Sequence, residues 1–536
     1  MLKVDNLSVA FGQSMAVKGI NFSLEGNQIL GIVGESGSGK SVTSLSIMGL
    51  LPKNARITNG SIWFEPPGCI PVNLVGINPE QHRQLRGKSI AMIFQEPHTC
   101  LNPSMRCGVQ LVEALELHAG LKGKPAVKQC LSLLSEMQLP DPETISRSYP
   151  HQLSGGQKQR VMIAMALAGK PKLLIADEPT TALDVTVQKG ILELLLSLRN
   201  RYGMGIIFIS HDLSVVEQVA DRVLVMRNGM MVEEGKAEDI LQKPQHPYTR
   251  ELIGFRREIY SPGNSSKTRN EGGGVVFSVN SLTVRYEKSN RLSAGKAKNQ
   301  IRAVSNVSFS IHEGETLGLV GESGSGKSTI GRTLLRLIGN YSGQIAYKGK
   351  PLNGFTTQQL KEFRREVQLI FQDPYSSLNP RLTIGQALVE PVVVHGLAGK
   401  NEAKSRVLEL LDRVKLPADS FYRFPHEFSG GQRQRLVIAR ALTLQPKVLI
   451  CDEIISALDI AIQVQILNLL EELKRDFNLT YLFISHDLGV VRHISNRVIV
   501  LKEGTIDEEG PAEAIFAQPK STYTKTLIAA MPQLLA

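Results

Sequence analysis

One Gly- and Ser-rich motif occurs twice and is the part of this chain best suited to chemistry. GESGSGKS stands at residues 34–41 and again at residues 321–328, each time after an apolar run that predicts a strand and before a predicted helix. Glycines let the backbone bend so that successive N–H groups point at phosphate oxygens. In such a loop Lys40 neutralises the β- and γ-phosphates of a nucleotide, and the Ser41 hydroxyl is a ligand for Mg²⁺. The predicted loop residues are Gly34, Glu35, Ser36, Gly37, Ser38, Gly39, Lys40, Ser41 and Val42, then Gly321, Glu322, Ser323, Gly324, Ser325, Gly326, Lys327, Ser328 and Thr329.

Each half also contains two adjacent acids at the end of an apolar run. They are Asp177 and Glu178 in LLIADEP, and Asp452 and Glu453 in VLICDE. A carboxylate at the C-terminal end of a strand can bind Mg²⁺, and its neighbour can polarise an attacking water. Alone, such a pair more often caps a helix or lies in a solvated turn. Together with the two loops it indicates catalysis, with the aspartates as Mg²⁺ ligands and the glutamates as catalytic residues.

The third repeated motif is SGGQ, at residues 154–157 and 429–432. A serine and two glycines directly before a predicted helix place backbone N–H groups and the positive end of the helix dipole where a phosphate can bind. The alternative for each serine is a plain helix N-cap. The predicted anion-binding residues are Ser154, Gly155, Gly156, Gln157, Ser429, Gly430, Gly431 and Gln432.

The strands and helices that must position these motifs repeat as the motifs do. The loop motif recurs at an offset of 321 − 34 = 287 residues, and SGGQ recurs at 429 − 154 = 275. Short continuous apolar runs predict strands of a mostly parallel sheet covered on both faces, and this alternation with helices indicates an α/β fold. The predicted strands are residues 28–33, 173–176, 206–209, 316–320, 448–451 and 481–484, and two predicted helices are residues 158–169 and 433–444.

The repeat divides the chain into two domains of similar size. We expect the first domain at residues 1–260 and the second at residues 275–536. Residues 261–274 are rich in Ser, Gly and Asn, which predicts a flexible linker. A second polar stretch, at residues 287–300, predicts an exposed loop between two strands.

The composition of the 536 residues excludes several classes of protein. Apolar residues make up 42% and charged residues 21%, unlike a disordered, collagen-like or disulfide-dense chain. The net charge of 61 − 50 = +11 suits nucleic acid, nucleotide phosphates or an anionic membrane surface without choosing among them. Five scattered cysteines without a CxxC pair indicate reduced thiols. With no visible secretory signal and no run of about 18 apolar residues, we expect the chain to serve a membrane only as a peripheral subunit.

LSGGQ at residues 153–157 and FSGGQ at residues 428–432 resemble the signature of ATP-binding-cassette (ABC) ATPases. The resemblance covers nearly the whole chain. It implies an α/β fold of two tandem ABC-type P-loop ATPase domains, each with a RecA-like core sheet and a helical subdomain. It also implies ATP and Mg²⁺ as cofactors, with the signature of one domain closing on the γ-phosphate held by the other.

The resemblance gives roles to further residues. Gln95 and Gln372 match the glutamine that contacts Mg²⁺ and the attacking water and that senses the transmembrane partner. The histidine that contacts the γ-phosphate is matched by His211 and His486. The aromatic residue that stacks on adenine is matched by Phe11 and Tyr286, and the ALD segments at residues 182–184 and 457–459 match the part that crosses the dimer interface.

A finer resemblance points to oligopeptide and dipeptide importers. It consists of EPHTCLNP at residues 96–103, DPYSSLNP at residues 373–380, and HPYTR at residues 246–250 with STYTK at residues 521–525 as a degraded copy. The role of the HPYT segment stays open. The chain is similar to the fused type in Yej-type peptide uptake and glutathione import, which implies an ATP-hydrolysing subunit of an importer for peptides or peptide-like solutes.

The implied partners are two transmembrane permease subunits and an external solute-binding protein, without nucleic acid. The implied location is peripheral, at the cytoplasmic face of the bacterial inner membrane. The alternative is a soluble twin-cassette ABC protein acting on ribosomes or nucleic acid. Those factors have long charged helical linkers, or zinc-binding cysteines in DNA repair ATPases, which this sequence does not show. The solute is not encoded in this chain: dipeptide, oligopeptide, glutathione and metal chelate all stay open.

The second copy departs from the family pattern after its catalytic glutamate. The first copy reads DEPTTALD, whereas the second reads DEIISALD, with Ile454 and Ile455 in place of Pro and Thr. Because proline fixes φ, its loss predicts a less firmly placed Glu453 and a slower second site.

Overall fold

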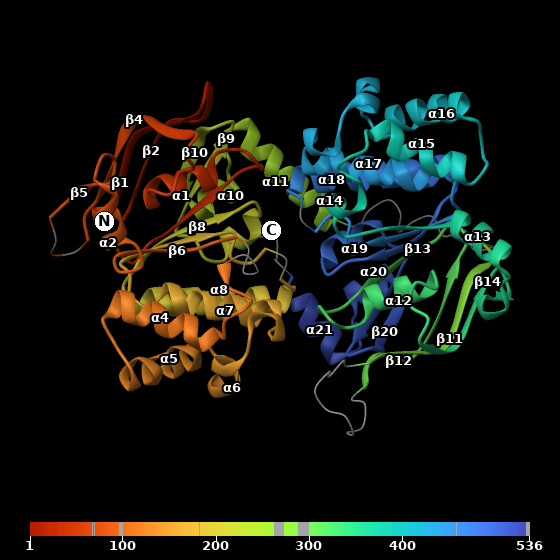
Figure 1. The fold of residues 1–536 in the computed structure, drawn as a ribbon, viewed down its shortest axis with the longest axis horizontal. Coiled ribbons are helices and arrows are strands. Elements are labelled where there is room, and N and C mark those ends of the chain that lie inside the picture. Colours follow the sequence, from red (N-terminus) through yellow and green to blue (C-terminus); the bar gives the residue numbers. More distant parts are fainter. Residues whose placement is uncertain are drawn as a thin grey trace. The chain divides into compact units, whose positions relative to one another are not determined.

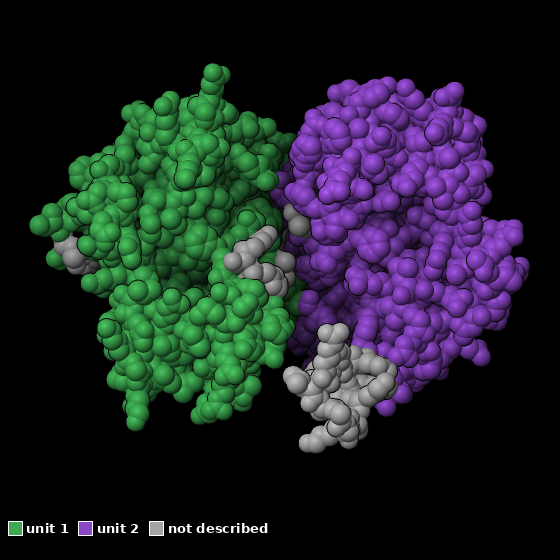
Figure 2. All heavy atoms as spheres, in the orientation of Figure 1, with its two compact units in different colours: residues 1–255, 532–536 green, residues 256–531 purple. Residues whose placement is uncertain are grey.

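The computed structural model describes residues 1–66, 68, 70–95, 100–181, 183–261, 273–287, 300–456 and 458–531. The chain divides into two compact units, Met1–Phe255 and Arg256–Met531 (Figure 2). The division falls inside helix α11 (Pro247–Tyr260), before the predicted linker. Most of that linker, and residues 288–299 of the predicted loop, lie outside the described residues.

The first unit contains two sheets and a group of helices (Figure 1). Its core sheet has the order β10-β9-β3-β8-β7-β6 and is parallel except for β10, and a smaller antiparallel sheet has the order β2-β1-β4-β5. The strands are β1 (Leu2–Phe11), β2 (Ser14–Leu24), β3 (Ile29–Val33), β4 (Ala55–Phe64), β5 (Val72–Asn73), β6 (Ile90–Ile93), β7 (Leu173–Asp177), β8 (Gly205–Ser210), β9 (Arg222–Arg227) and β10 (Met230–Lys236). The helices besides α11 are α1 (Lys40–Met48), α2 (Pro79–Leu85), α4 (Cys107–Ala119), α5 (Lys124–Glu136), α6 (Pro142–Arg147), α7 (Gly155–Ala166), α8 (Val185–Tyr202), α9 (Leu213–Glu217) and α10 (Ala237–Gln242).

The second unit repeats this plan. Its core sheet has the order β16-β17-β18-β13-β19-β20, and its smaller sheet has the order β12-β11-β14-β15. The strands are β11 (Val275–Glu287), β12 (Gln300–His312), β13 (Thr316–Val320), β14 (Tyr341–Tyr347), β15 (Lys350–Pro351), β16 (Val367–Ile370), β17 (Val448–Asp452), β18 (Thr480–Ile484), β19 (Arg497–Lys502) and β20 (Thr505–Pro511). The helices are α12 (Lys327–Leu334), α13 (Thr357–Glu366), α14 (Pro374–Ser377), α15 (Ile384–Val394), α16 (Lys400–Arg413), α17 (Gly430–Leu442), α18 (Ile460–Phe477), α19 (Leu488–Ile494), α20 (Ala512–Ala517) and α21 (Thr522–Ala529).

The predicted α/β fold and its six predicted strands are confirmed. Every residue of β3, β7, β8, β13, β17 and β18 is buried, as expected for parallel strands covered on both faces. The helical subdomain of the first unit consists of α4, α5 and α6 packed beside α7 (Figure 1). Among the described residues, no helix combines the length and the apolar character that a membrane crossing requires.

Two predicted helices begin earlier than expected, at the glycines of SGGQ. α7 begins at Gly155 and α17 at Gly430, because Ser154 and Ser429 cap these helices. Each serine side chain accepts a hydrogen bond from the backbone N–H of the motif glutamine, and the glutamine side chain accepts one from the serine N–H. The capping alternative is therefore the observed local geometry. It pairs the N–H of each motif glutamine, whereas the N–H groups of the two glycines face the helix start, as in any α-helix.

The two glycines of the motif have different surroundings. A Cβ atom added at Gly156 would lie 2.4 Å from the side chain of Val187 in α8, whereas one at Gly155 would have its nearest neighbour at 3.4 Å. The second copy is alike, with 2.6 Å at Gly431 and 3.8 Å at Gly430. The second glycine therefore permits close packing of two helices, and the first leaves the helix start accessible.

We predict that Gly156→Ala lowers the free energy of unfolding by about 1–3 kcal/mol, because the β-branched Val187 side chain has little freedom to move aside. Gly155→Ala, the matched control, should change it by less than about 0.5 kcal/mol. Urea unfolding followed by circular dichroism measures both. Equal losses in the two variants would contradict the packing argument.

Candidate functional site

The loop between β3 and α1 has the bend that phosphate binding requires. Gly34, Gly37 and Gly39 have φ angles of 151°, 80° and 101°, and the corresponding glycines of the second copy have 147°, 82° and 102°. These backbone conformations favour glycine. A Cβ atom at Gly34 would lie 2.2 Å from the carbonyl oxygen of Met226 in β9, so no larger residue fits there.

The loop lysines lie inside this bend. The Lys40 ammonium donates hydrogen bonds to the carbonyl oxygens of Gly34 at 2.7 Å and Glu35 at 2.8 Å. Lys327 makes the same two contacts in the second loop, at 2.6 and 2.9 Å. Both ammonium groups are thus held at the centre of the predicted phosphate site.

The predicted Mg²⁺ ligands of each copy lie together. The Ser41 hydroxyl donates to the Asp177 carboxylate at 3.2 Å, and Ser328 donates to Asp452 at 2.7 Å. Burial raises the pKa of Asp177 to about 6, against the lowering effect of the Ser41 hydrogen bond. The pKa of Asp452 is raised for the same reason. A nearby cation would favour the charged form of both carboxylates.

Both predicted catalytic glutamates have an unusual backbone. Glu178 and Glu453 have φ angles of 48° and 50°, in the left-handed region that non-glycine residues seldom adopt. A backbone hydrogen bond holds each of them: the Glu178 N–H donates to the Ile209 carbonyl oxygen, and the Glu453 N–H donates to that of Ile484, both at 2.9 Å. Such conformations cost on the order of 1 kcal/mol and gather at functional sites. Glu453, which Ile454 follows in place of a proline, has nearly the same φ angle as Glu178.

Three side chains contact the Glu178 carboxylate. One of its oxygens accepts hydrogen bonds from Gln95 at 2.9 Å and Thr181 at 2.9 Å, and lies 3.2 Å from Nδ1 of His211. Burial raises its pKa, but His211 and Thr181 outweigh burial and bring the pKa of Glu178 down to about 2. Conversely, burial lowers the pKa of His211, but Glu178 and Asp212 outweigh burial and raise it overall.

The second copy differs at one of these partners. Gln372 donates to Glu453 at 2.7 Å, and Nδ1 of His486 lies 3.5 Å from the same oxygen. Ser456, which aligns with Thr181, instead donates to the backbone carbonyl of Glu453 at 3.0 Å. Sequence reasoning missed the role of Thr181, although the change from DEPTTALD to DEIISALD contains it.

The structure brings one of the two predicted adenine-stacking residues to the phosphate loop. Tyr286 in β11 is exposed, and its hydroxyl lies 3.4 Å from the Thr329 hydroxyl in α12. Phe11 is the last residue of β1, opposite Ser14 and Ala55. Ala182 and Ala457 of the ALD segments lie outside the described residues, as do residues 96–99 after Gln95.

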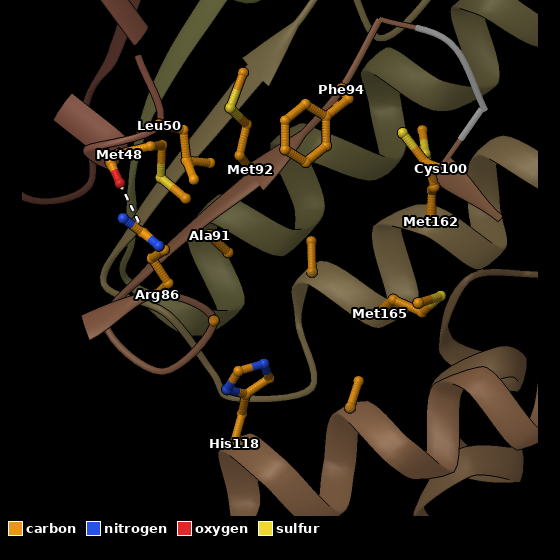
Figure 3. Close-up of a pocket in the computed structure, with 13 residues that line it drawn as sticks. Met48, Leu50, Arg86, Ala91, Met92, Phe94, Cys100, His118, Met162 and Met165 are labelled. Atoms are coloured by element: carbon orange, nitrogen blue, oxygen red, sulfur yellow. Dashed lines mark hydrogen bonds between the residues drawn. The ribbon is translucent and has the colours of Figure 1, made fainter. Parts of the chain in front are cut away.

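An apolar cavity of about 330 Å³ in the first unit is lined in part by Phe94, the residue before Gln95 (Figure 3). It lies between β6, α4 and α7, and methionine side chains form much of its wall. The Arg86 side chain at its margin donates to the Met48 carbonyl at 2.8 Å. Its lining includes Met48, Leu50, Met92, Phe94, Met162 and Met165. Leu50 and Phe94 are 37% and 38% exposed, so the cavity continues onto an apolar surface.

Comparison with known proteins gives two family matches. Residues 17–181 and 304–456 match the family described as ABC transporter. Residues 232–272 and 508–536 match the family described as oligopeptide/dipeptide transporter, C-terminal region. Each cassette is therefore followed by its own C-terminal region.

Several curated proteins are similar over almost the whole chain. Glutathione import ATP-binding protein GsiA of Escherichia coli strain K12 is 46% identical over 99% of this chain and 89% of its own length. The protein of the same name from E. coli O6:H1 shows the same values, and that of Shigella flexneri is 45% identical over the same shares. These matches lend no support to the ribosome or nucleic acid alternative.

The two ABC matches cover more than half of the chain, and the relatives span nearly all of it. The chain therefore belongs to the ABC transporter ATP-binding proteins, as the ATP-hydrolysing subunit of an importer for peptides or peptide-like solutes with both nucleotide-binding domains on one chain.

Proposed function

We propose that this subunit energises the import of glutathione or a closely related short peptide. The observation that carries the proposal is the 46% identity, over 99% of the chain, to proteins named for glutathione import. The subunit would act at the cytoplasmic face of the inner membrane with two permease subunits, and an external binding protein would deliver the solute.

We propose that each ATP binds with Mg²⁺. A serine hydroxyl beside a buried carboxylate, as in Ser41 with Asp177, offers the oxygen ligands that Mg²⁺ prefers. The amide oxygen of Gln95 is a further candidate ligand, and Ser328, Asp452 and Gln372 form the equivalent set. When bound, the ion would neutralise charge on the β- and γ-phosphates. The raised pKa of Asp177 fits a carboxylate that a cation keeps charged.

In this mechanism Glu178 orients the attacking water. Its lowered pKa keeps the carboxylate charged at neutral pH, so it can accept a hydrogen bond from water. Thr181 and Gln95 hold one oxygen of this carboxylate and so orient its other oxygen, which would accept the hydrogen bond from water. Lys40 and His211 would contact the γ-phosphate, and the backbone N–H groups of the loop would hold the phosphates in place. The second copy would act in the same way, through Glu453, Lys327 and His486. Adenine would stack on Phe11 in one site and on Tyr286 in the other. The SGGQ residues of both copies would contact a γ-phosphate.

We propose that a short apolar helix of a permease subunit docks in the apolar cavity of the first unit. The methionine lining suits such a partner, because methionine side chains adapt to the shape of an apolar surface. Phe94 lines the cavity and precedes Gln95, whose amide contacts Glu178. A partner at this position would therefore act on the catalytic carboxylate through a single residue.

The transport proposal is tested by uptake of labelled glutathione in a strain that lacks this gene. Uptake should return with the wild-type chain and stay absent with a Lys40→Ala/Lys327→Ala double variant, which removes both loop ammonium groups. A strain that keeps its glutathione uptake but loses uptake of a dipeptide would overturn the glutathione assignment and leave the peptide importer intact.

A substitution in the wall of the cavity tests the docking proposal. Met165→Glu should reduce solute uptake at least tenfold while basal ATP hydrolysis of the isolated subunit stays within about twofold, because burying a carboxylate against an apolar helix is costly. Val127→Glu, on the exposed surface of α5, is the control and should leave uptake unchanged. Loss of basal hydrolysis in Met165→Glu would mean that the cavity supports the ATP site instead.

The charge pairing at the catalytic site is tested by titration of His211. Glu178→Gln removes the main group that raises the pKa of His211 and leaves only the Asp212 charge against the effect of burial, so the pKa of His211 should fall. NMR titration of the histidine ring signals, with His211→Asn for assignment, measures the change. Glu453→Gln should leave His211 as it is. An unchanged or higher pKa in Glu178→Gln would refute the pairing.

A further inference from the structure

The HPYT segment, whose role the sequence leaves open, touches the phosphate loop. Tyr248 is the second residue of α11 and is 1% exposed. Its hydroxyl oxygen accepts a hydrogen bond from the backbone N–H of Glu35 at 3.2 Å. Glu35 is also the residue whose carbonyl receives the Lys40 ammonium at 2.8 Å. The tyrosine thus holds the peptide at the entrance of the loop, directly beside the lysine site.

The degraded copy of the motif makes the same contact. Tyr523 lies at the start of α21, and its hydroxyl accepts from the N–H of Glu322 at 3.3 Å. The carbonyl of Glu322 receives the Lys327 ammonium at 2.9 Å. The offset of the two tyrosines, 523 − 248 = 275, equals that of the SGGQ motifs. The contact therefore belongs to the repeated design of the chain.

Different residues hold the tyrosine in the two copies. The N–H of Tyr248 donates to Nδ1 of His246 at 3.2 Å, and the N–H of Tyr523 donates to the Ser521 hydroxyl at 3.1 Å. In front of each helix a glutamate accepts two backbone N–H groups. Glu233 accepts at 2.7 and 3.1 Å, and Glu508 in the second copy accepts at 2.9 and 3.1 Å. The histidine has been replaced, but the turn and the tyrosine are kept.

Each tyrosine ring is also fixed from the side of the core sheet. The Arg227 guanidinium lies 4.5 Å from the centre of the Tyr248 ring, and the Lys502 ammonium lies 5.1 Å from that of Tyr523. Arg227 follows Met226, whose carbonyl packs against Gly34. The same strand end therefore positions both the loop and the tyrosine that holds it.

We propose that Tyr248 and Tyr523 are positioning residues for ATP binding, which makes the C-terminal region of each cassette a part of its nucleotide site. A glycine-rich loop loses conformational freedom when it closes around phosphates. A hydrogen bond that orders the loop beforehand reduces this loss, and so favours binding. The Tyr248 hydroxyl contacts the backbone of the loop at Glu35. Removal of this hydroxyl therefore weakens nucleotide binding and leaves the chemical step intact.

The test uses the full chain with Tyr248→Phe and Tyr523→Phe, singly and together. One neutral hydrogen bond per site predicts that the double variant raises Kd and KM for ATP roughly fivefold, while kcat stays within twofold. In the nucleotide-free protein, hydrogen exchange of the peptides covering residues 34–40 and 321–327 should become faster. Each single variant should accelerate exchange only in its own loop.

The matched controls remove tyrosine hydroxyls that bind glutamates elsewhere. The Tyr202 hydroxyl donates to Glu136 at 3.0 Å, and the Tyr347 hydroxyl donates to Glu366 at 2.7 Å. Tyr202→Phe and Tyr347→Phe should change neither KM nor loop exchange. The proposal is overturned by an unchanged KM and unchanged loop exchange in the double variant, by equal changes in the controls, or by a fall in kcat alone.

A second pair of variants covers the case in which the Tyr248→Phe and Tyr523→Phe variants fail to fold. Glu233→Gln and Glu508→Gln keep both tyrosine hydroxyls and weaken the turns in front of α11 and α21. They should raise KM for ATP about twofold and accelerate exchange in the same two loops. Unchanged values in these folded variants would also overturn the proposal. The inference rests on ATP hydrolysis and not on the solute, so the uptake experiment and this one fail independently.

Discussion

The carboxyl end of the parallel core sheet is the constraint on which both ATP sites depend. In the first unit Gly34 follows β3, Gln95 follows β6, Asp177 ends β7 and His211 follows β8. These strands are neighbours in the order β3-β8-β7-β6 and run parallel, so their ends meet at one edge of the sheet. Gln95 and Glu178 are 83 residues apart in sequence and yet share a hydrogen bond of 2.9 Å.

At this edge one residue, Glu178, combines a strained backbone with a buried charge. Glu178 keeps a left-handed backbone that its neighbours must stabilise, and its N–H bond to Ile209 does so. Its carboxylate is buried, which is costly for a charge unless hydrogen bonds compensate. Gln95, Thr181 and His211 supply that compensation, so the contacts that position this carboxylate also make its buried charge tolerable.

The two copies keep some contacts of this arrangement and change others. Pro179 is replaced by Ile454, yet both glutamates have similar φ angles and the same long-range N–H bond. His246 is exchanged for Ser521, and each of these side chains accepts the N–H of the tyrosine two residues on. In contrast, the Thr181 hydroxyl donates to the Glu178 carboxylate, whereas the Ser456 hydroxyl donates to the Glu453 backbone carbonyl, so the two predicted catalytic glutamates have different surroundings.

The sequence by itself determined the α/β fold, the six buried strands, the duplication and the places of both glycine-rich loops, because each of these rests on a local pattern of glycines or apolar runs. Phosphate loops and strand-end acids need only a few consecutive residues to be recognised. Tertiary structure alone decided the positive φ of Glu178, the contact between Tyr248 and Glu35 across 213 residues, the apolar cavity of the first unit and the need for a second glycine opposite Val187. These features arise where elements distant in sequence pack together, and neither side of such a contact carries a local signal for the other.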